Sequence, residues 1–376
     1  MTNLVVPVNE PLLTGNEKKY LLNCIETGWI SSEGPYVCRF EEDVARTVSR
    51  KYGIAVSNGS VALDLAIAAL GIAEGDEVII PTNTIISCAA AVLRSGAKPV
   101  VVDCCPDTFN MRPQDIKEKI NSRTKAIMVV HIFGITVDID PILKIAEENN
   151  LYIIEDAAEM MGQHYKDKPC GSFGDISTFS FYSNKHITTG EGGMVVTNSK
   201  DLSDKCRYYR NLCFDNTKRF QHEHLGWNMR LTNMQAAIGV AQLEQLDKFV
   251  SIKKEIGENY TKMLEGVEEI QLPLRKTEYC SNNYWVYPIV LKDKFKHDAI
   301  ELQSHLAKYN IGTRPFFWPI HQQNVFKKIG LFKNERYPVS ERIAKKGFYI
   351  PSGMALTLKQ QKYVVKTLKK ILNNLS

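Results

Sequence analysis

Short apolar runs separated by helical patterns dominate the first half of the chain. Seven runs rich in β-branched residues and bounded by turn residues predict strands at 54–57, 77–80, 99–103, 126–131, 151–155, 177–181 and 193–197. These runs lack a clean alternation of apolar and polar positions. They therefore fit strands buried on both faces of a mainly parallel sheet with right-handed crossovers. The pattern predicts an α/β fold whose central sheet is built from the first half of the sequence.

The second half of the chain changes character. From residue 232 apolar residues recur at intervals of three and four positions, which predicts a linking helical region of about 35 residues. A strand-rich stretch follows at 283–291, then a helix at 297–309, a strand at 312–317 and a closing helix at 357–372. We expect a large domain with an N-terminal segment over 1–245 and a smaller α+β domain over 246–376.

Composition fits this two-domain reading and narrows the function. The chain has 376 residues, 44% of them apolar and 24% charged, as in soluble folded proteins. The net charge of +5 is small, and the lysines between 359 and 370 alternate with apolar residues, which predicts a solvated helix face rather than a nucleic-acid site. Nine cysteines without paired CxxC spacing indicate reduced thiols and no metal site. No basic leader and no run of about 18 apolar residues is found, so we expect a cytoplasmic protein that does not span a membrane.

Two stretches, 153–159 (IIEDAAE) and 178–193 (TFSFYSNKHITTGEGG), carry the clearest chemistry. Asp156 ends an apolar run, where α/β sheets present functional groups to a ligand crevice. Lys185 follows in a loop rich in Ser, Thr and Gly. A pyridoxal-5′-phosphate (PLP) cofactor needs a lysine that condenses with its aldehyde and an aspartate that keeps its pyridine nitrogen protonated. Either residue alone would more often be structural, but together they favour PLP chemistry.

The segment 57–70 (SNGSVALDLAIAAL) predicts a strand that runs through Asn58, Gly59 and Ser60 directly into an apolar helix. The first N–H groups of such a helix can receive a phosphate, helped by the Ser60 hydroxyl. Glycine lets the backbone approach closely. The signal is weak alone, because serine is common at helix starts for structural reasons. Ser180 offers a second hydroxyl.

Nine segments together resemble the DegT-type family of nucleotide-sugar aminotransferases over essentially the whole chain. They are 27–32 (TGWISS), 57–66 (SNGSVALDLA), 77–84 (EVIIPTNT), 99–103 (PVVVD), 126–134 (AIMVVHIFG), 153–159 (IIEDAAE), 179–193 (FSFYSNKHITTGEGG), 226–243 (GWNMRLTNMQAAIGVAQL) and 312–321 (GTRPFFWPIH). The resemblance implies the aspartate-aminotransferase fold (fold type I) and PLP as cofactor. The most similar subgroup is that of the GDP-perosamine synthases, which implies amination at C4 of GDP-4-keto-6-deoxymannose for O-antigen lipopolysaccharide.

The resemblance also assigns roles residue by residue. It implies that Lys185 binds PLP covalently, that Asp156 contacts the pyridine nitrogen, and that the remaining cofactor contacts are Gly59, Ser60, Ile85, Glu159 and Ser180. Asn228 would reach the phosphate from a neighbouring subunit, so a homodimer with shared active sites is expected. The sugar-nucleotide cleft would be lined by Trp29, Ser31, Arg230, Arg314 and His321. From the sequence alone, Trp29 fits a packed aromatic residue equally well, and Arg314 fits a buried salt bridge.

One position departs from the family pattern. Ile85 stands where relatives usually place an aromatic ring over the cofactor, and an aliphatic side chain lacks the flat stacking geometry. We therefore expect weaker PLP binding. Met160 and Met161 likewise replace small residues.

The expected reaction is a ping-pong transamination. An amino acid, glutamate by resemblance, leaves its amine on the cofactor, the keto sugar collects it, and the freed Lys185 shuttles the proton. Alternatives are another dTDP- or UDP-linked keto sugar, C3 in place of C4, a PLP sugar dehydratase and a silent regulatory homologue. A dehydratase carries histidine in place of Lys185, and retention of Asp156, Ser180 and Lys185 argues against a silent protein. A nicotinamide dehydrogenase needs GxGxxG after the first strand, which SNGSVA does not supply.

Overall fold

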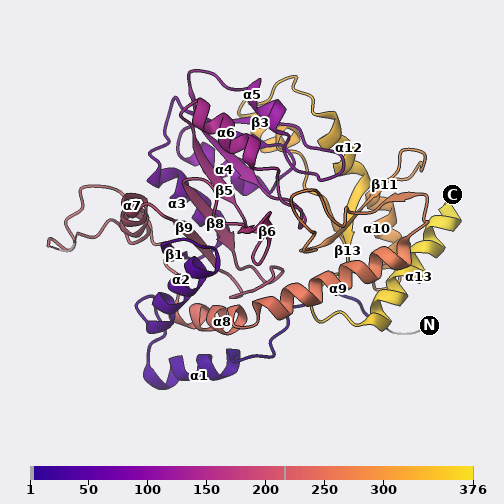
Figure 1. Cartoon of the computed structure of the whole chain (residues 1–376), viewed down its shortest axis with the longest axis horizontal. Helices are drawn as coiled ribbons and strands as arrows, with labels where there is room; N and C mark the ends of the chain where they lie inside the picture. The colour runs from indigo at the N-terminus through magenta and orange to yellow at the C-terminus, as the bar shows by residue number, and fades with distance from the viewer. Residues whose placement is uncertain (1–3, 216, 376) are drawn as a thin grey trace.

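A seven-stranded sheet forms the centre of the molecule in the computed structural model, which describes residues 4–215 and 217–375 (Figure 1). The sheet order is β1-β9-β8-β5-β4-β2-β3, and β3, β2, β4, β5 and β8 run parallel, while β9 is antiparallel to both neighbours. The strands are β1 (Tyr52–Val56), β2 (Glu77–Pro81), β3 (Lys98–Val102), β4 (Thr124–Val130), β5 (Tyr152–Asp156), β8 (Ile176–Ser180) and β9 (Gly193–Thr197). All seven predicted strands are confirmed, with ends within two residues of those expected.

Helices cover both faces of this sheet, as continuous apolar strands require. Alternate residues of one strand enter different cores, so Met128 packs with the core around α3 and α4, and Val129 packs with the core around α6. The helices of this large unit (residues 35–243) are α2 (Pro35–Thr47), α3 (Gly59–Ala69), α4 (Ile86–Arg94), α5 (Pro113–Lys117), α6 (Asp140–Glu148), α7 (Lys200–Arg210) and α8 (Asn233–Leu243). The helix α1 (Glu17–Thr27) precedes them and packs on α8.

The direction of the strands determines where the site lies. Strands β1, β2, β5 and β8 all point the same way, because β1 is antiparallel to β9 and β9 is antiparallel to β8. The carboxyl ends of parallel strands meet at one edge of a sheet. The turn at 58–60, the residues after β2, Asp156 and Ser180 are thus brought to the same edge from four separate strands.

A second, smaller sheet belongs to the small unit, residues 270–375. Its order is β10-β11-β13-β12, all antiparallel, with its own core against α9, α10 and α13. The elements are β10 (Ile270–Gln271), β11 (Tyr287–Leu291), α10 (Ala299–Ala307), β12 (Arg314–Pro315), η1 (Ile320–Gln322), α11 (Asn324–Lys328), α12 (Pro338–Lys346), β13 (Gly347–Ile350) and α13 (Leu358–Leu375). The predicted strand at 312–317 is only the two-residue β12, and β13 was not anticipated, because four residues leave too little period to read.

The linking region joins the two units as two helices and not one. The helix α8 ends at Leu243 and α9 (Leu246–Leu264) begins after a break, then runs across the molecule to α13 (Figure 1). The chain start also joins the small unit, since Val6 exchanges backbone hydrogen bonds with Asn310 and Gly312 and is buried in the same core. The division into domains at residue 245, with the N-terminal segment in the large domain, remains a prediction.

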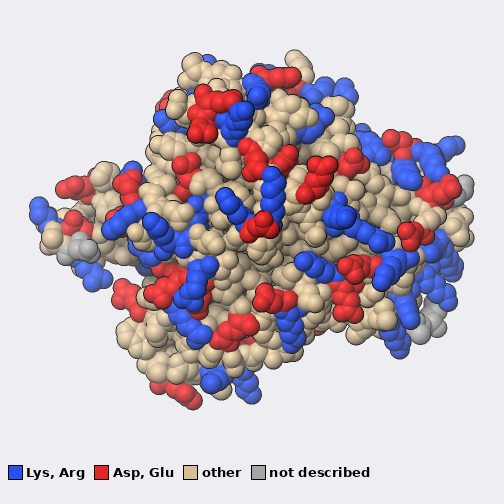
Figure 2. Space-filling model, in the orientation of Figure 1, with Lys and Arg blue, Asp and Glu red and all other residues tan. Residues whose placement is uncertain are grey.

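The lysines of α13 form the solvated face that the sequence predicts. Val364, Leu368 and Leu372 are buried, while Lys362 and Lys366 are exposed, and Figure 2 shows Lys and Arg gathered at this end of the molecule. Among the described helices, none combines the length and the apolar character that a membrane crossing requires.

One lysine is buried where α9 crosses the small unit. The side chain of Lys253 is 1% exposed, and its Nζ donates to the carbonyl oxygens of Trp285 at 2.8 Å and Ser352 at 2.7 Å. Burial without a neighbouring carboxylate lowers the pKa of Lys253 to about 7. This amine joins the long helix to two segments of the small unit.

We predict that replacing Lys253 with Met reveals a pH-dependent part of the stability. The folded protein loses this proton near pH 7, whereas the unfolded chain retains it up to its ordinary value of 10.5. Between these values the unfolded chain binds more protons, so the stability contributed by Lys253 rises with pH. Urea unfolding should show Lys253→Met less stable than the wild type by about 1–3 kcal/mol at pH 9, and by less at pH 7.

The control is Lys366→Met, which replaces an exposed lysine of α13. Its stability relative to the wild type should not change between pH 7 and pH 9. An equal loss for Lys253→Met at both pH values would contradict the assignment of a lowered pKa to this buried amine.

Candidate active site

A cavity of about 800 Å³ opens at the carboxyl edge of the large sheet. Segments that are far apart in sequence line it. The large unit contributes Asn58, Gly59, Ser60, Thr84, Ile85, Ser87, His131, Asp156, Glu159, Ser180, Tyr182, Asn184 and Lys185, and the small unit contributes Trp285, Phe317 and Tyr349. The cavity thus lies between the two units.

One end of the cavity is built from the start of α3. The Asn58 side chain accepts a hydrogen bond from Val61 N at 3.0 Å and caps the helix, whose first N–H groups have no partner within the helix. The hydroxyls of Ser60 and Ser87 lie 2.7 Å apart. A Cβ placed on Gly59 would lie 2.8 Å from Ser180 Cβ, so a side chain there would fill the cradle. Hydroxyls and a helix N-terminus around an open backbone fit a phosphate group.

The opposite side of the cavity carries a buried carboxylate at the end of β5. Asp156 is 3% exposed, and it accepts hydrogen bonds from Ala158 N at 3.0 Å and from the Cys88 thiol at 3.4 Å. Burial raises the pKa of Asp156, while the Ala158 amide and the charge of Lys185 oppose this rise. A cationic ring nitrogen would supply the missing countercharge, so Asp156 fits the pyridine end of PLP.

Glu159 and Lys185 are two further buried titratable groups in the same cavity, and their charges interact. Glu159 accepts a hydrogen bond from Phe133 N at 2.7 Å, and burial raises its pKa to about 8 against the opposing charge of Lys185. Burial of the amine lowers the pKa of Lys185, and the two carboxylates oppose that change. A lysine with a lowered pKa has a larger uncharged fraction near neutral pH. It can then act as a nucleophile or a base.

The loop that carries Lys185 is fixed by contacts from the small unit and from the start of the chain. The carbonyl oxygen of Asn184 accepts hydrogen bonds from Trp285 Nε1 at 2.9 Å and from Asn9 Nδ2 at 3.2 Å. The loop returns to β9 through the GEGG motif, where a Cβ on Gly193 would lie 2.5 Å from Asn58 O. Glycine is needed there because β9 passes directly beside the turn that starts α3.

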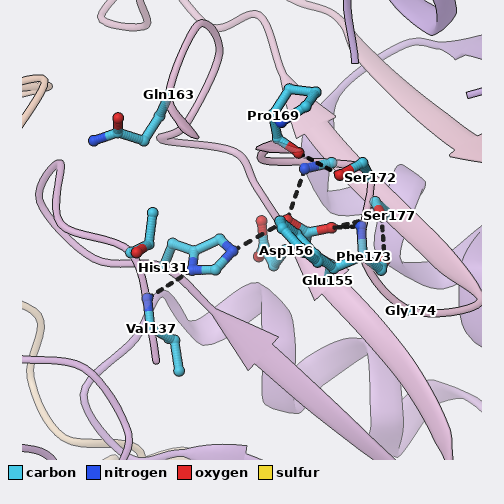
Figure 3. A network of polar contacts seen from close by, with 12 residues as sticks. His131, Val137, Glu155, Asp156, Gln163, Pro169, Ser172, Phe173, Gly174 and Ser177 are labelled. Carbon is cyan, nitrogen blue, oxygen red and sulfur yellow. Dashed lines mark hydrogen bonds and ion pairs between the residues drawn. The ribbon is translucent and has the colours of Figure 1, made fainter. Parts of the chain in front are cut away.

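Glu155, next to Asp156 in β5, has a purely structural set of contacts (Figure 3). Its carboxylate accepts hydrogen bonds from His131 Nε2 at 3.1 Å, Gly171 N at 2.6 Å, Phe173 N at 3.0 Å and Ser177 Oγ at 2.9 Å. Successive strand residues point to opposite faces, so Glu155 holds the segment before β8 while Asp156 faces the cavity.

The same cluster has a spacing that resembles a metal site. Ligand atoms of His131, Glu155 and Cys170 lie within 4.8 Å of one another. The Glu155 carboxylate already accepts four hydrogen bonds, one of them from His131 Nε2. The other ring nitrogen of His131, Nδ1, accepts a hydrogen bond from Val137 N at 2.9 Å, so neither side chain keeps a free ligand atom. We therefore assign no metal to this cluster.

The structure brings together seven of the predicted site residues. Gly59, Ser60, Ile85, Asp156, Glu159, Ser180 and Lys185 all line the cavity. Ile85 is half-exposed at its mouth, with 43% of its surface accessible, and Met160 and Met161 are buried in a core away from it.

The other six predicted residues do not line the cavity of the single chain. Asn228, Trp29, Ser31 and Arg314 are exposed, and Arg230 is half-buried, with its Nη1 donating to Asn211 Oδ1 at 2.5 Å. His321 is buried, and its ring nitrogens contact Thr82 Oγ1 at 2.8 Å and Glu341 Oε1 at 3.2 Å. These contacts join the end of β2 to α12 of the small unit, and the cleft-lining role of His321 remains a prediction.

Sequence reasoning missed several residues of the cavity. Ser87 lies in the first turn of α4, just after the conspicuous Thr84 and Ile85, and a helical reading of that segment would have found it. Trp285, Phe317 and Tyr349 come from the small unit and had no local signal, because only the packing of the two units places them beside Lys185.

Comparisons with known proteins agree with this geometry. The model of the DegT/DnrJ/EryC1/StrS aminotransferase family matches residues 11–369. A protein named GDP-perosamine synthase from Escherichia coli O157:H7 is 42% identical over 96% of this chain and 97% of its own length. One of the same name from Vibrio cholerae is 40% identical over 98% and 100%. The crystal structure of the aminotransferase TlmJ from Streptoalloteichus hindustanus superimposes with a TM-score of 0.91 and 26% identity over 98% of this chain and 99% of that one.

We predict that Gly59→Ala weakens PLP binding. The added Cβ would lie 2.8 Å from Ser180 Cβ and would narrow the phosphate cradle. Overpacking of this kind costs about 1–3 kcal/mol, which corresponds to roughly a fivefold to 150-fold loss of PLP affinity. Absorbance titration of the cofactor-free protein with PLP measures the dissociation constant of the cofactor.

Gly71→Ala is the matched control at the other end of α3. Gly71 has a φ of +69°, in the left-handed region, and open space around it, so alanine strains the backbone there without touching the cavity. Gly71→Ala should lower stability and leave PLP affinity unchanged. Equal affinities for Gly59→Ala and the wild type would show that the phosphate lies elsewhere.

Proposed function

We propose that this chain transfers an amino group from an amino acid to C4 of a GDP-linked 4-keto-6-deoxy sugar. The chain belongs to the DegT/DnrJ/EryC1/StrS aminotransferase family. The chain is a PLP-dependent aminotransferase. The observation that carries the proposal is the convergence of Asp156, Lys185 and the Gly59 cradle in one cavity. Each matches one part of the cofactor: ring nitrogen, aldehyde and phosphate.

The chain's own residues account for binding and orientation. Ser60, Ser180 and the start of α3 would hold the phosphate, and Asp156 would accept a hydrogen bond from the ring nitrogen. When bound, PLP supplies an aldehyde that carries the amino group and a ring that accepts electrons as the substrate proton leaves. The Ala158 amide and the Cys88 thiol keep the Asp156 carboxylate directed into the cavity.

Lys185 has the environment of a proton carrier. Its lowered pKa leaves Nζ able to take a proton from a substrate carbon, and the charges of Glu159 and Asp156 limit that lowering. Tethering this amine beside the reacting carbon replaces an encounter in solution by a fixed geometry.

The acceptor is inferred from the relatives and from the family resemblance. The two GDP-perosamine synthases match nearly the full length of this chain, which supports GDP-4-keto-6-deoxymannose as the keto sugar. A cavity of about 800 Å³ is within the range that holds a cofactor or a drug-sized ligand. Glutamate is the proposed donor, from the family resemblance alone.

We further propose a homodimer with shared sites, which the charges around the cavity support. Among the described residues that line it, the Lys and Arg side chains are Lys185 and Arg94, and Arg94 already pairs with Asp64 at 2.6 Å. A cofactor phosphate and a nucleotide diphosphate bring more negative charge than these residues balance. Asn228 and Arg230 of a second copy would supply the missing donors, and the exposed Trp227 beside them fits an interface.

The acceptor can be tested in the half-reaction. Enzyme loaded with pyridoxamine phosphate should convert GDP-4-keto-6-deoxymannose about tenfold or more faster than dTDP- or UDP-linked 4-keto sugars, because buried polar groups discriminate strongly between nucleotides. Absorbance follows the return of the cofactor to its aldehyde form, and mass spectrometry identifies the amino sugar. A faster reaction with another nucleotide would reassign the acceptor and leave the aminotransferase activity intact.

Two variants, Lys185→Arg and Lys185→Ala, test whether Lys185 is the catalytic lysine. A guanidinium stays protonated, so Arg cannot condense with the aldehyde or take up a proton. Neither variant should turn over with any keto sugar, although both should bind PLP without a covalent link. Normal transamination by either one would refute Lys185 as the catalytic lysine.

Shared sites predict complementation between two inactive variants. Lys185→Ala and Asn228→Ala damage different parts of the same site, so a mixed dimer would keep one intact site. Subunit exchange in an equal mixture should restore about a quarter of wild-type activity, because half of the dimers are mixed. If both variants are dimeric and exchange subunits but no activity returns, the shared site is ruled out.

A further inference from the structure

Trp285 is the aromatic residue that lies directly against the catalytic amine. Its side chain is 3% exposed, and Lys185 Nζ lies 4.1 Å from the centre of the indole ring. This distance is well inside the range in which an ammonium is attracted to the face of an aromatic ring, and indole is the strongest such partner. Trp285 precedes β11 and comes from the small unit, a hundred residues after Lys185.

The indole is held in place from several directions. Its Nε1 donates to Asn184 O at 2.9 Å, so one side chain contacts both the backbone before Lys185 and the amine of Lys185 itself. The ring stacks on Phe133 with an interplanar angle of 15°, and Lys253 Nζ donates to the carbonyl oxygen of Trp285 at 2.8 Å. A ring fixed in this way receives the amine without losing further rotamer freedom.

The ring complements the two carboxylates that also face Lys185. Asp156 is needed by the cofactor nitrogen, and burial raises the pKa of Glu159 to about 8, so neither gives the amine a dedicated countercharge. An indole face attracts the ammonium, takes no proton and does not compete for the cofactor. Asp156 and Glu159 interact with the amine, His186 lies within range of its charge, and His131, Tyr182 and Tyr349 line the same cavity.

We propose that Trp285 is a positioning residue for Lys185, whose indole face holds the amine whenever the lysine is released from the cofactor. The inference rests on the proposed role of Lys185 and adds a second residue to it. In a transaminase the lysine must be free for half of the catalytic cycle. The ring keeps its amine beside the reacting position during that time and favours its protonated form.

The test measures the pKa of Lys185 in enzyme loaded with pyridoxamine phosphate, in which the lysine is free. Labelling with acetic anhydride at pH 6 to 11, followed by peptide mass spectrometry, reports each amine separately. Removal of the ring destabilises the ammonium, so the pKa of Lys185 should fall by about one pH unit in Trp285→Leu and by less in Trp285→Phe. An equal pKa in all three proteins would overturn the proposal.

Lys253 is the internal control in the same spectra. It is buried and donates to the backbone of residue 285, which neither substitution removes, so it should remain protected from the label. Increased labelling of Lys253 in Trp285→Leu would show that the packing has opened. In that case Trp285→Phe, which retains a ring against Phe133, decides between the outcomes. A pKa of Lys185 below the wild-type value in this variant supports the proposal, and an unchanged pKa overturns it. No turnover is measured, so a wrong acceptor would not affect the result.

Discussion

Two buried carboxylates and one amine share a single cavity, and their charge balance is the constraint on which the site depends. Asp156 and Glu159 face the single amine of Lys185 in surroundings that disfavour every ion, and a pKa of about 8 leaves Glu159 largely protonated near neutral pH. The pKa values of the carboxyls are raised and that of the amine is lowered. Such a site stabilises a cationic ring that pairs with Asp156, and it keeps Lys185 close to the point where it can lose or gain a proton.

The scaffold maintains this balance by giving adjacent residues different tasks. Glu155 and Asp156 follow each other in β5, yet Glu155 is saturated by four donors in the protein interior and Asp156 faces the cavity. Because the chain alternates its side chains, a strand end can anchor a loop with one carboxylate and offer the next to a ligand. The loop anchored by Glu155 leads directly into β8, whose end carries Ser180.

The small unit completes the site from the other side. Trp285 contacts the amine of Lys185, and Lys253 ties the segments of Trp285 and Ser352 to the long helix α9. His321, with no place in the cavity, joins Thr82 after β2 to Glu341 of α12. The relative position of the two units therefore decides the surroundings of the catalytic amine, and buried polar contacts between them fix that position.

The sequence by itself determined the large sheet and the part of the site that each strand end carries. The seven apolar runs form strands whose ends lie within two residues of those predicted. At or after the ends of such runs stand Asp156, Lys185 and the turn at Gly59 and Ser60, so the local pattern and the chemistry coincide there. Packing alone decided what local pattern does not encode: the break between α8 and α9, the four-residue β13, the burial of His321, and the indole of Trp285 over Lys185. The burial of His321 against Thr82 and the placement of Trp285 over Lys185 depend on contacts between residues 239 and 100 positions apart, which no periodicity in a short window can report.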